Sequence, residues 1–355
     1  MPMSINSVMR RFLIVCVKRV RTLPESSPVD PQIMKPLVKR LQAAATFAKK
    51  VGLVDRDEEA RQLWIEVYPK LSEGKPGRIG HVTSRAESQV MRFALIYALM
   101  DQSNVIRKEH LEASLALWRY SEASCLYLWG DSVGDPDADK LLSDQTSSRS
   151  YGVAWPEPAA PEAYYGLPGD IVRAIEPVTE SHPIALLTQI LLMFGFYCGR
   201  QAHFRVSSAD RHYSNVFVLL VGPNATARKG ASYGRVRAFY EELDDWPAAQ
   251  GRIKDGWSTS EGLIKAVRDP DADDHHEQID RRLLALAPQF SALLQVMGRL
   301  ANTLGSTIRQ AWDSGNLQHL DISMRNPGLT ATGAHISILG HVTQAHLQKY
   351  MDKMT

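Results

Sequence analysis

A short basic segment between positions 222 and 232 carries the clearest chemical signal in the chain. The apolar run Val216–Val221 predicts a buried strand that ends at Gly222, and a helical pattern resumes after Lys229. At such a junction, backbone N–H groups and the helix dipole face a bound anion while a lysine neutralises its charge. We therefore predict a phosphate-binding loop made of Gly222, Arg228, Lys229, Gly230, Ala231 and Ser232, with Ser232 as a magnesium ligand.

The spacing of this segment departs from the standard phosphate loop of nucleotide-binding proteins. Lys229 lies seven residues after Gly222 instead of six, and Arg228 occupies the position before the lysine that is usually glycine. On spacing alone, an ordinary basic turn explains the segment as well as a phosphate loop does.

Alternating strands and helices must position this loop. Further apolar runs predict strands at Phe12–Val17, Leu283–Leu286 and Ile336–Leu339. This alternation favours an α/β fold, with a central, mostly parallel sheet covered by helices. Helical spacing predicts helices at Ser84–Met100, Glu109–Trp129, Ile184–Cys198, Ala231–Leu243 and Thr343–Lys353, with Ser181 as the N-cap of the third.

Composition and charge narrow the class of protein. The 355 residues are 44% hydrophobic and 23% charged, which excludes a disordered or collagen-like chain. The net charge of +2 does not demand a nucleic-acid partner, although the first fifty residues hold ten Lys or Arg and only two acids. Three cysteines without metal-ligand spacing favour a reducing environment. Because the apolar runs are too short for a signal peptide or a bilayer, we expect a soluble, cytoplasmic protein with no membrane partner.

Several long strings resemble the P-loop ATPase domain of phage- and plasmid-borne primase–helicase proteins. The phosphate-loop region is similar to that family's nucleotide-binding loop, and other stretches are similar to its further segments. The loop region comprises the strings ADRHYSNVFVLLVG at 209–222 and RKGAS at 228–232. The further strings are GWSTSEGLIKAVRD at 256–269, IRQAWDSGNLQ at 308–318, NPGLTATGAHISILGHVT at 326–343, RFLIVCVKR at 11–19 and RAESQVMRFALIYALMD at 85–101.

The order of these strings differs from that of the family. The block resembling residues 1–142 follows the GAHISILGHVT segment in the family, whereas here it comes first. The chain therefore reads as a circular permutation, natural or engineered. The resemblance implies three parts: residues 1–142 with one sheet strand and a helical lid, a linker at 143–169 joining the original termini, and a P-loop core at 170–355.

The resemblance also implies roles for residues outside the loop. Arg11 matches an arginine that could act on the nucleotide of a neighbouring subunit, and Arg85 resembles a sensor arginine of ring-shaped helicases. A strand-end surface charge and a helix-face ion pair explain these arginines equally simply. His341 ends a strand where a polar residue can sense a phosphate, beside Thr343 as a possible cap. Glu261 is a catalytic candidate, or only an acid beside a capping serine.

Two positions depart from the family at the end of the strand Leu283–Leu286. The family carries acids there that hold magnesium and orient water, but this chain has Ala287 and Gln289, and Asp280 precedes the strand. We expect an ATP- and Mg²⁺-binding module of a mobile-element replication protein, acting as a homo-oligomeric ring on single-stranded DNA, with a possible primase partner. The alternative is a hydrolysis-deficient nucleotide-binding or structural interaction module.

Overall fold

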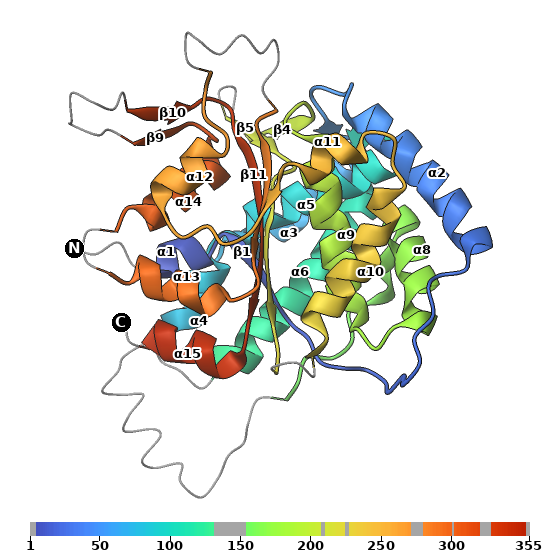
Figure 1. Ribbon diagram of the computed structural model, residues 1–355, viewed down its shortest axis with the longest axis horizontal. Coiled ribbons are helices and arrows are strands. Elements are labelled where there is room, and N and C mark those ends of the chain that lie inside the picture. Colours follow the sequence, from blue (N-terminus) through green and yellow to red (C-terminus); the bar gives the residue numbers. More distant parts are fainter. Residues whose placement is uncertain are drawn as a thin grey trace, which may run out of the picture.

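A central parallel sheet organises the computed structural model, which is drawn in Figure 1. The structure describes residues 5–130, 154–206, 210–223, 227–270, 280–299, 302–319 and 328–352. In spatial order, the five strands are β1 (Phe12–Cys16), β6 (Phe217–Val221), β11 (His335–Val342), β8 (Arg282–Ala287) and β7 (Ile253–Lys254).

All four neighbouring strand pairs of this sheet are parallel, with Phe217 of β6 opposite both Phe12 and Ile338. The carboxyl ends of the strands therefore meet at one edge of the sheet. The predicted α/β class with a central parallel sheet covered by helices is confirmed. Each predicted strand is present, and β11 extends beyond the predicted Ile336–Leu339.

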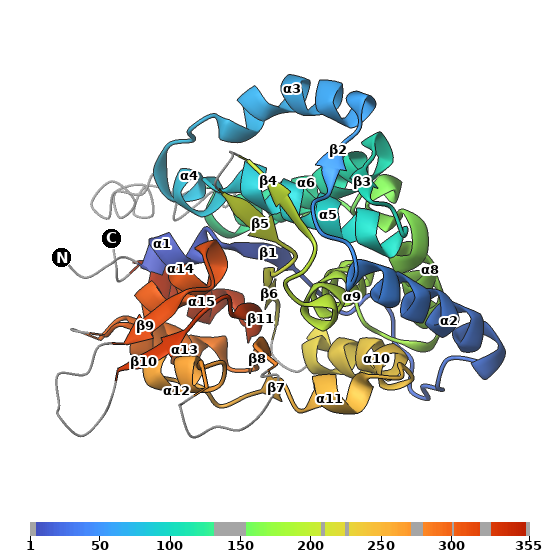
Figure 2. The same ribbon diagram turned by 90° about the horizontal axis from the view of Figure 1, so that it is seen from above.

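Residue alternation along the strands builds two cores, one on each face of the sheet. Leu13 and Val15 belong to one core, whereas Phe12, Ile14 and Cys16 belong to the other. Figure 2 shows α9 and α10 on the first side and α12 to α15 on the second. The first group includes α2 (Pro31–Ala48), α8 (Gly166–Ile175), α9 (Pro183–Cys198), α10 (Lys229–Glu241) and α11 (Trp246–Gln250); the second has α1 (Ile5–Met9), α12 (Ser260–Lys265), α13 (Phe290–Met297), α14 (Leu304–Asp313) and α15 (Gln344–Asp352).

The long helix α6 (Lys108–Trp129) covers the outer edge of β1. Tyr120 Oη donates to Cys16 O at 2.8 Å, and Ser121 Oγ donates to Ile14 O at 2.9 Å. Cys16 N in turn donates to Ser124 Oγ at 3.0 Å. These side chains replace the missing neighbouring strand, so backbone groups at the sheet edge are paired rather than exposed.

Shorter elements complete the description. Helices α3 (Glu58–Ser72), α4 (Gly77–Thr83) and α5 (Ala86–Met100) precede α6, and 3₁₀ turns lie at Pro161–Tyr164 and Glu176–Val178. Three two-stranded sheets pair β2 (Asp55–Arg56) with β3 (Val105–Ile106), β4 (His203–Arg205) with β5 (Arg211–Tyr213), and β9 (Leu317–His319) with β10 (Leu329–Ala331). Across the described ranges, no helix is long and apolar enough to cross a membrane.

Two local predictions need correction. The N-cap of α9 is His182, whose side chain accepts from Ile184 N, rather than Ser181. Helix α8 begins at Gly166, so the end of the predicted linker 143–169 is helical and packs against α9. Residues 131–153, which include the first part of that linker, 143–153, lie outside the described residues.

Candidate functional site

The predicted phosphate loop lies at the carboxyl edge of the sheet, between the ends of β1 and β11. Gly222 N donates to Val342 O at 3.2 Å. A Cβ atom on Gly222 would lie 2.1 Å from Val17 O, so no other residue fits at this position without a shift of the backbone. Residues 224–226 of the loop lie outside the described residues. The loop therefore starts in close contact with the ends of β1 and β11.

Lys229 is the first residue of α10, and its side chain folds back over the loop. Its Nζ donates to Gly222 O at 2.7 Å and to Pro223 O at 2.8 Å. Burial lowers the pKa of Lys229 to about 8, so the ammonium group is still mostly protonated at pH 7. The residue before it, Arg228, has a left-handed φ of 52° and makes no side-chain cap. Among the described residues, no side-chain cap is thus found for the first turn of α10, which includes the exposed Gly230 and Ala231.

The carboxylate of Glu180, from a distant part of the chain, binds an arginine of the loop. Glu180 Oε2 accepts from Arg228 Nε at 2.6 Å, and Glu180 Oε1 accepts from Leu23 N at 2.7 Å. Arg19 also pairs with this carboxylate. The Leu23 hydrogen bond, followed by the two arginines, lowers the pKa of Glu180 against the opposing effect of burial. Sequence reasoning missed Glu180 because it lies 48 residues from Arg228.

The loop also has a buried imidazole beside it. Burial, with a further contribution from the Lys229 charge, lowers the pKa of His341 to about 4, so the ring is neutral at pH 7. Its Nε2 is buried and has no hydrogen-bond partner among the described residues. A buried polar atom without a partner near a lysine suits a site that a polar ligand completes.

Ser232 faces away from the open side of the loop. The residue is fully buried, and its Oγ donates to Lys229 O at 2.7 Å and accepts from Gln189 Nε2 at 2.6 Å. The hydroxyl therefore binds α9 and the first turn of α10. Its role as a magnesium ligand stays a prediction.

The carboxyl end of β8 offers no acid to a divalent cation. Ala287 ends the strand, and Gln289 is the N-cap of α13. Asp280 lies at the opposite end, where it pairs with Arg282 at 2.6 Å. Within the described ranges, no group of three or more His, Cys, Asp or Glu side chains could hold a metal ion. Neither Ala287 nor Gln289 can supply the carboxylate that the family carries at this position.

The remaining candidates lie apart from the loop. Arg11 precedes β1, at the amino edge of the sheet, where its Nη2 pairs with Asp313 at 2.5 Å and only 3% of it is exposed. Arg85 is the N-cap of α5 and lies near Arg11, whose pKa is lowered chiefly by burial and further by the Arg85 charge. Because β1 is five residues long, this edge is about 17 Å from the loop. Arg11 therefore lies away from the loop, at the opposite edge of the sheet, and Arg85 lies near Arg11.

Glu261 lies in the first turn of α12, and the cap of that helix is a threonine rather than a serine. Thr259 Oγ1 accepts from Gly262 N at 3.0 Å. The helix packs against β9 and β10. The structure thus brings Gly222, Arg228, Lys229, Ser232 and His341 together, but it does not bring Arg11 or Arg85 to them.

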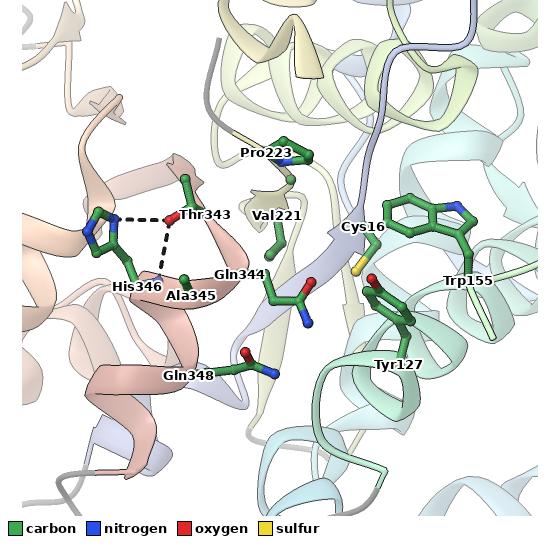
Figure 3. Close-up of a pocket in the computed structure, with 11 residues that line it drawn as sticks. Cys16, Tyr127, Trp155, Val221, Pro223, Thr343, Gln344, Ala345, His346 and Gln348 are labelled. Carbon is green, nitrogen blue, oxygen red and sulfur yellow. Dashed lines mark hydrogen bonds between the residues drawn. The ribbon is translucent and has the colours of Figure 1, made fainter. Parts of the chain in front are cut away.

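A cavity of about 550 Å³ opens directly beside the loop, and we call it the edge cavity. Figure 3 shows Tyr127 and Trp155 on one wall and the glutamines of α15 on the opposite wall. Its lining includes Cys16, Tyr127, Trp155, Gly222, Gln344 and Gln348. Sequence reasoning missed this cavity because its walls come from five separated segments.

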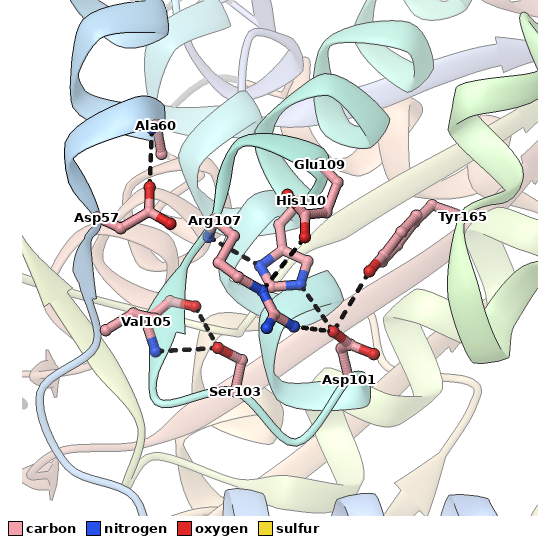
Figure 4. Close-up of polar contacts among 9 residues, drawn as sticks. All are labelled: Asp57, Ala60, Asp101, Ser103, Val105, Arg107, Glu109, His110 and Tyr165. Carbon is pink, nitrogen blue, oxygen red and sulfur yellow. Dashed lines mark hydrogen bonds and ion pairs between the residues drawn. The ribbon is translucent and has the colours of Figure 1, made fainter.

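A polar cluster on the helical side of the chain is structural. Asp101 lies 3.2 Å from His110 Nε2 and 3.4 Å from Tyr165 Oη, and it also pairs with Arg107, as Figure 4 shows. His110 Nδ1 accepts from Arg107 N at 3.0 Å, which caps α6. Burial lowers the pKa of His110. These contacts fasten Tyr165, which lies within the predicted linker, to α5 and α6.

Comparison with protein family models, with curated proteins and with solved structures finds no match for this chain.

Proposed function

We propose that this chain binds a nucleoside triphosphate, ATP, at the junction of β6 and α10, as the ATP-binding module of a mobile-element primase–helicase. The observation that carries the proposal is the position of Lys229, whose Nζ lies on the carbonyl oxygens of Gly222 and Pro223. A protonated lysine held over a loop that opens into a helix N-terminus is arranged to receive an anion. The resemblance of the surrounding strings supports ATP as that anion.

The topology of the sheet supports the same position. The adjacent strands β6 and β11 are followed by helices on opposite faces, α10 on one and α15 on the other. In open parallel sheets, such a change of side leaves a crevice at the carboxyl ends of the strands, where ligands bind. The loop, His341 and the edge cavity all lie there.

In this proposal, three groups bind the phosphates: Lys229, the first N–H groups of α10, and His341. Lys229 exchanges its two carbonyl acceptors for phosphate oxygens, and the first N–H groups of α10 donate to the same anion. The neutral His341 offers Nε2 as a further hydrogen-bonding atom. Magnesium neutralises phosphate charge when it is bound, and it enters with the nucleotide because the ion keeps mostly phosphate and water ligands.

Ring assembly and binding of single-stranded DNA follow from the resemblance. In this proposal, Arg11 and Arg85 act on the nucleotide of a neighbouring subunit in a homo-oligomeric ring. The many basic residues among the first fifty support contact with a DNA backbone, which weakens as salt rises. A primase module is a further partner that the resemblance implies.

Slow or absent hydrolysis is the second candidate property, and the end of β8 favours it. Ala287 and Gln289 cannot orient an attacking water as a carboxylate does. Introducing Ala287→Glu together with Gln289→Glu is expected to raise ATP turnover at least about 10-fold, the effect of a tuned general base or metal ligand. The rate of steady-state phosphate release measures this turnover. Rapid turnover by the unmodified chain would contradict this view.

Equilibrium binding of a fluorescent ATP analogue with magnesium tests the proposal. Replacement of Lys229 by alanine is expected to weaken binding about 10- to 100-fold, since a charge-assisted hydrogen bond is worth about 1.5–3 kcal/mol. Lys265→Ala, at an exposed site on α12, is the control and should bind like the parent. Equal binding by the parent and Lys229→Ala, or none by either, would overturn the proposal.

A further inference from the structure

The edge cavity has the composition of a small-molecule site. Its volume of about 550 Å³ lies within the range of about 300–1,000 Å³ usual for ligand pockets. Gly222 and Pro223 at the start of the phosphate loop form part of its wall. A ligand whose phosphates bind at Lys229 would therefore have its remaining part next to, or inside, this cavity.

One wall of the edge cavity is aromatic and apolar. The rings of Tyr127 and Trp155 are 5.1 Å apart in an edge-to-face arrangement, and Lys18 Nζ lies 4.6 Å from the centre of the Trp155 ring. Burial raises the pKa of Cys16 to about 12, so its side chain is an uncharged thiol. An aromatic and thiol-lined surface suits the flat, weakly polar faces of a nucleobase.

The opposite wall carries two amide side chains from α15. Figure 3 shows Gln344 and Gln348 extending from this helix toward Tyr127. Gln348 Nε2 donates to Leu128 O at 2.7 Å, and this bond fixes which way its amide points. Because the nitrogen is engaged, the amide oxygen of Gln348 is the atom left to accept a hydrogen bond from a ligand, and Figure 3 shows it on the side of Gln344.

We propose that the edge cavity is a nucleobase pocket that selects adenine over guanine, with Gln348 as the specificity-determining residue. This inference rests on the proposed triphosphate site. An acceptor at a fixed position favours the exocyclic amino group of adenine, whereas guanine presents a carbonyl oxygen at that place. Gln344, which has both a donor and an acceptor, pairs with the neighbouring ring nitrogen. The aromatic wall contacts the base without regard to its identity.

Titration calorimetry with magnesium and three ligands tests the pocket: ATP, GTP and inorganic tripolyphosphate, which carries the phosphates without a base. For the parent chain, ATP is expected to bind at least about 10-fold more tightly than GTP, and more tightly than tripolyphosphate. In Gln348→Leu the ratio of ATP to GTP affinity should fall toward one. Tripolyphosphate should bind this variant as it binds the parent, which also shows that the variant is folded.

A second variant and a control sharpen the result. Gln348→Lys replaces the acceptor by a donor and should abolish or reverse the preference, whereas Gln310→Leu, at an exposed site on α14, should leave it unchanged. Equal affinity of the parent for ATP and GTP, or an unchanged ratio in Gln348→Leu, would overturn the base pocket. Binding of tripolyphosphate in the same experiment would still support the phosphate site. Absence of binding by all three ligands would overturn both.

Discussion

Replacing Arg92 by leucine is expected to lower the free energy of unfolding by about 3–5 kcal/mol, because the variant removes the donor of several buried hydrogen bonds. Arg92 is fully buried on α5, where it joins that helix to the segment before β6 and to α14. Its Nη1 donates to Asn215 O at 2.8 Å, and its Nη2 donates to Trp312 O at 2.8 Å. The variant leaves these buried acceptors without donors, each at a cost of about 1–3 kcal/mol.

Two further features make Arg92 different from a surface arginine. Its guanidinium lies 4.1 Å from the centre of the Trp312 ring, and burial lowers its pKa to about 9, so it is charged at pH 7. Urea unfolding measures the effect. Arg119→Leu, at an exposed site on α6, is the control and should change stability by less than about 0.5 kcal/mol. A loss below about 1 kcal/mol for Arg92→Leu would contradict this account of the core.

Acid is expected to destabilise the fold well above the pH at which carboxylates titrate. His335 is fully buried at the start of β11, with Nε2 2.9 Å from Gly195 O, and burial lowers its pKa to about 3. The unfolded chain binds a proton at this residue below about pH 6.5, whereas the folded chain does not. The stability from the neutral ring is therefore fully present above pH 6.5 and is lost as pH falls toward 3.

This loss amounts to about 1.4 kcal/mol per pH unit for His335. Burial lowers the pKa of His182, His212 and His341 to about 4, which adds in the same direction. Urea unfolding between pH 7 and pH 5 should show a shallower pH slope for His335→Asn. The control Ile338→Val removes one methylene from the same strand and should lower stability without changing the slope. An equal slope in His335→Asn and the parent would refute the mechanism.

The sheet could be predicted from sequence where its strands are buried on both faces. Such strands are continuous apolar runs, as in β1 and β6, and both lie within a residue of the predicted positions. Strand β7 was missed because it comprises only Ile253 and Lys254 at the edge of the sheet. Helix starts were less accurate, since His182 caps α9 through a geometry that the pattern of residue types does not reveal.

The residues of the predicted loop could be named from sequence because they follow one another in the chain, and their role in binding phosphate stays a prediction. The residues that hold the loop in place could not be predicted, because they depend on contacts between distant segments. Glu180 reaches Arg228 from the turn before α9, and Gln189 reaches Ser232 from α9 itself. The edge cavity likewise needs β1, α6, β6 and α15 to be packed together before it exists. The permuted order and the roles of Arg11, Arg85 and Glu261 stay predictions.

A crystal structure of the chain with a non-hydrolysable ATP analogue and magnesium would test the central claim most directly. We predict phosphate oxygens within hydrogen-bonding distance of Lys229 Nζ and of the first N–H groups of α10. The lysine should then have left the carbonyl oxygens of Gly222 and Pro223, where it lies in the present structure. An analogue bound elsewhere, with Lys229 still on those carbonyls at saturating ligand, would contradict the assignment.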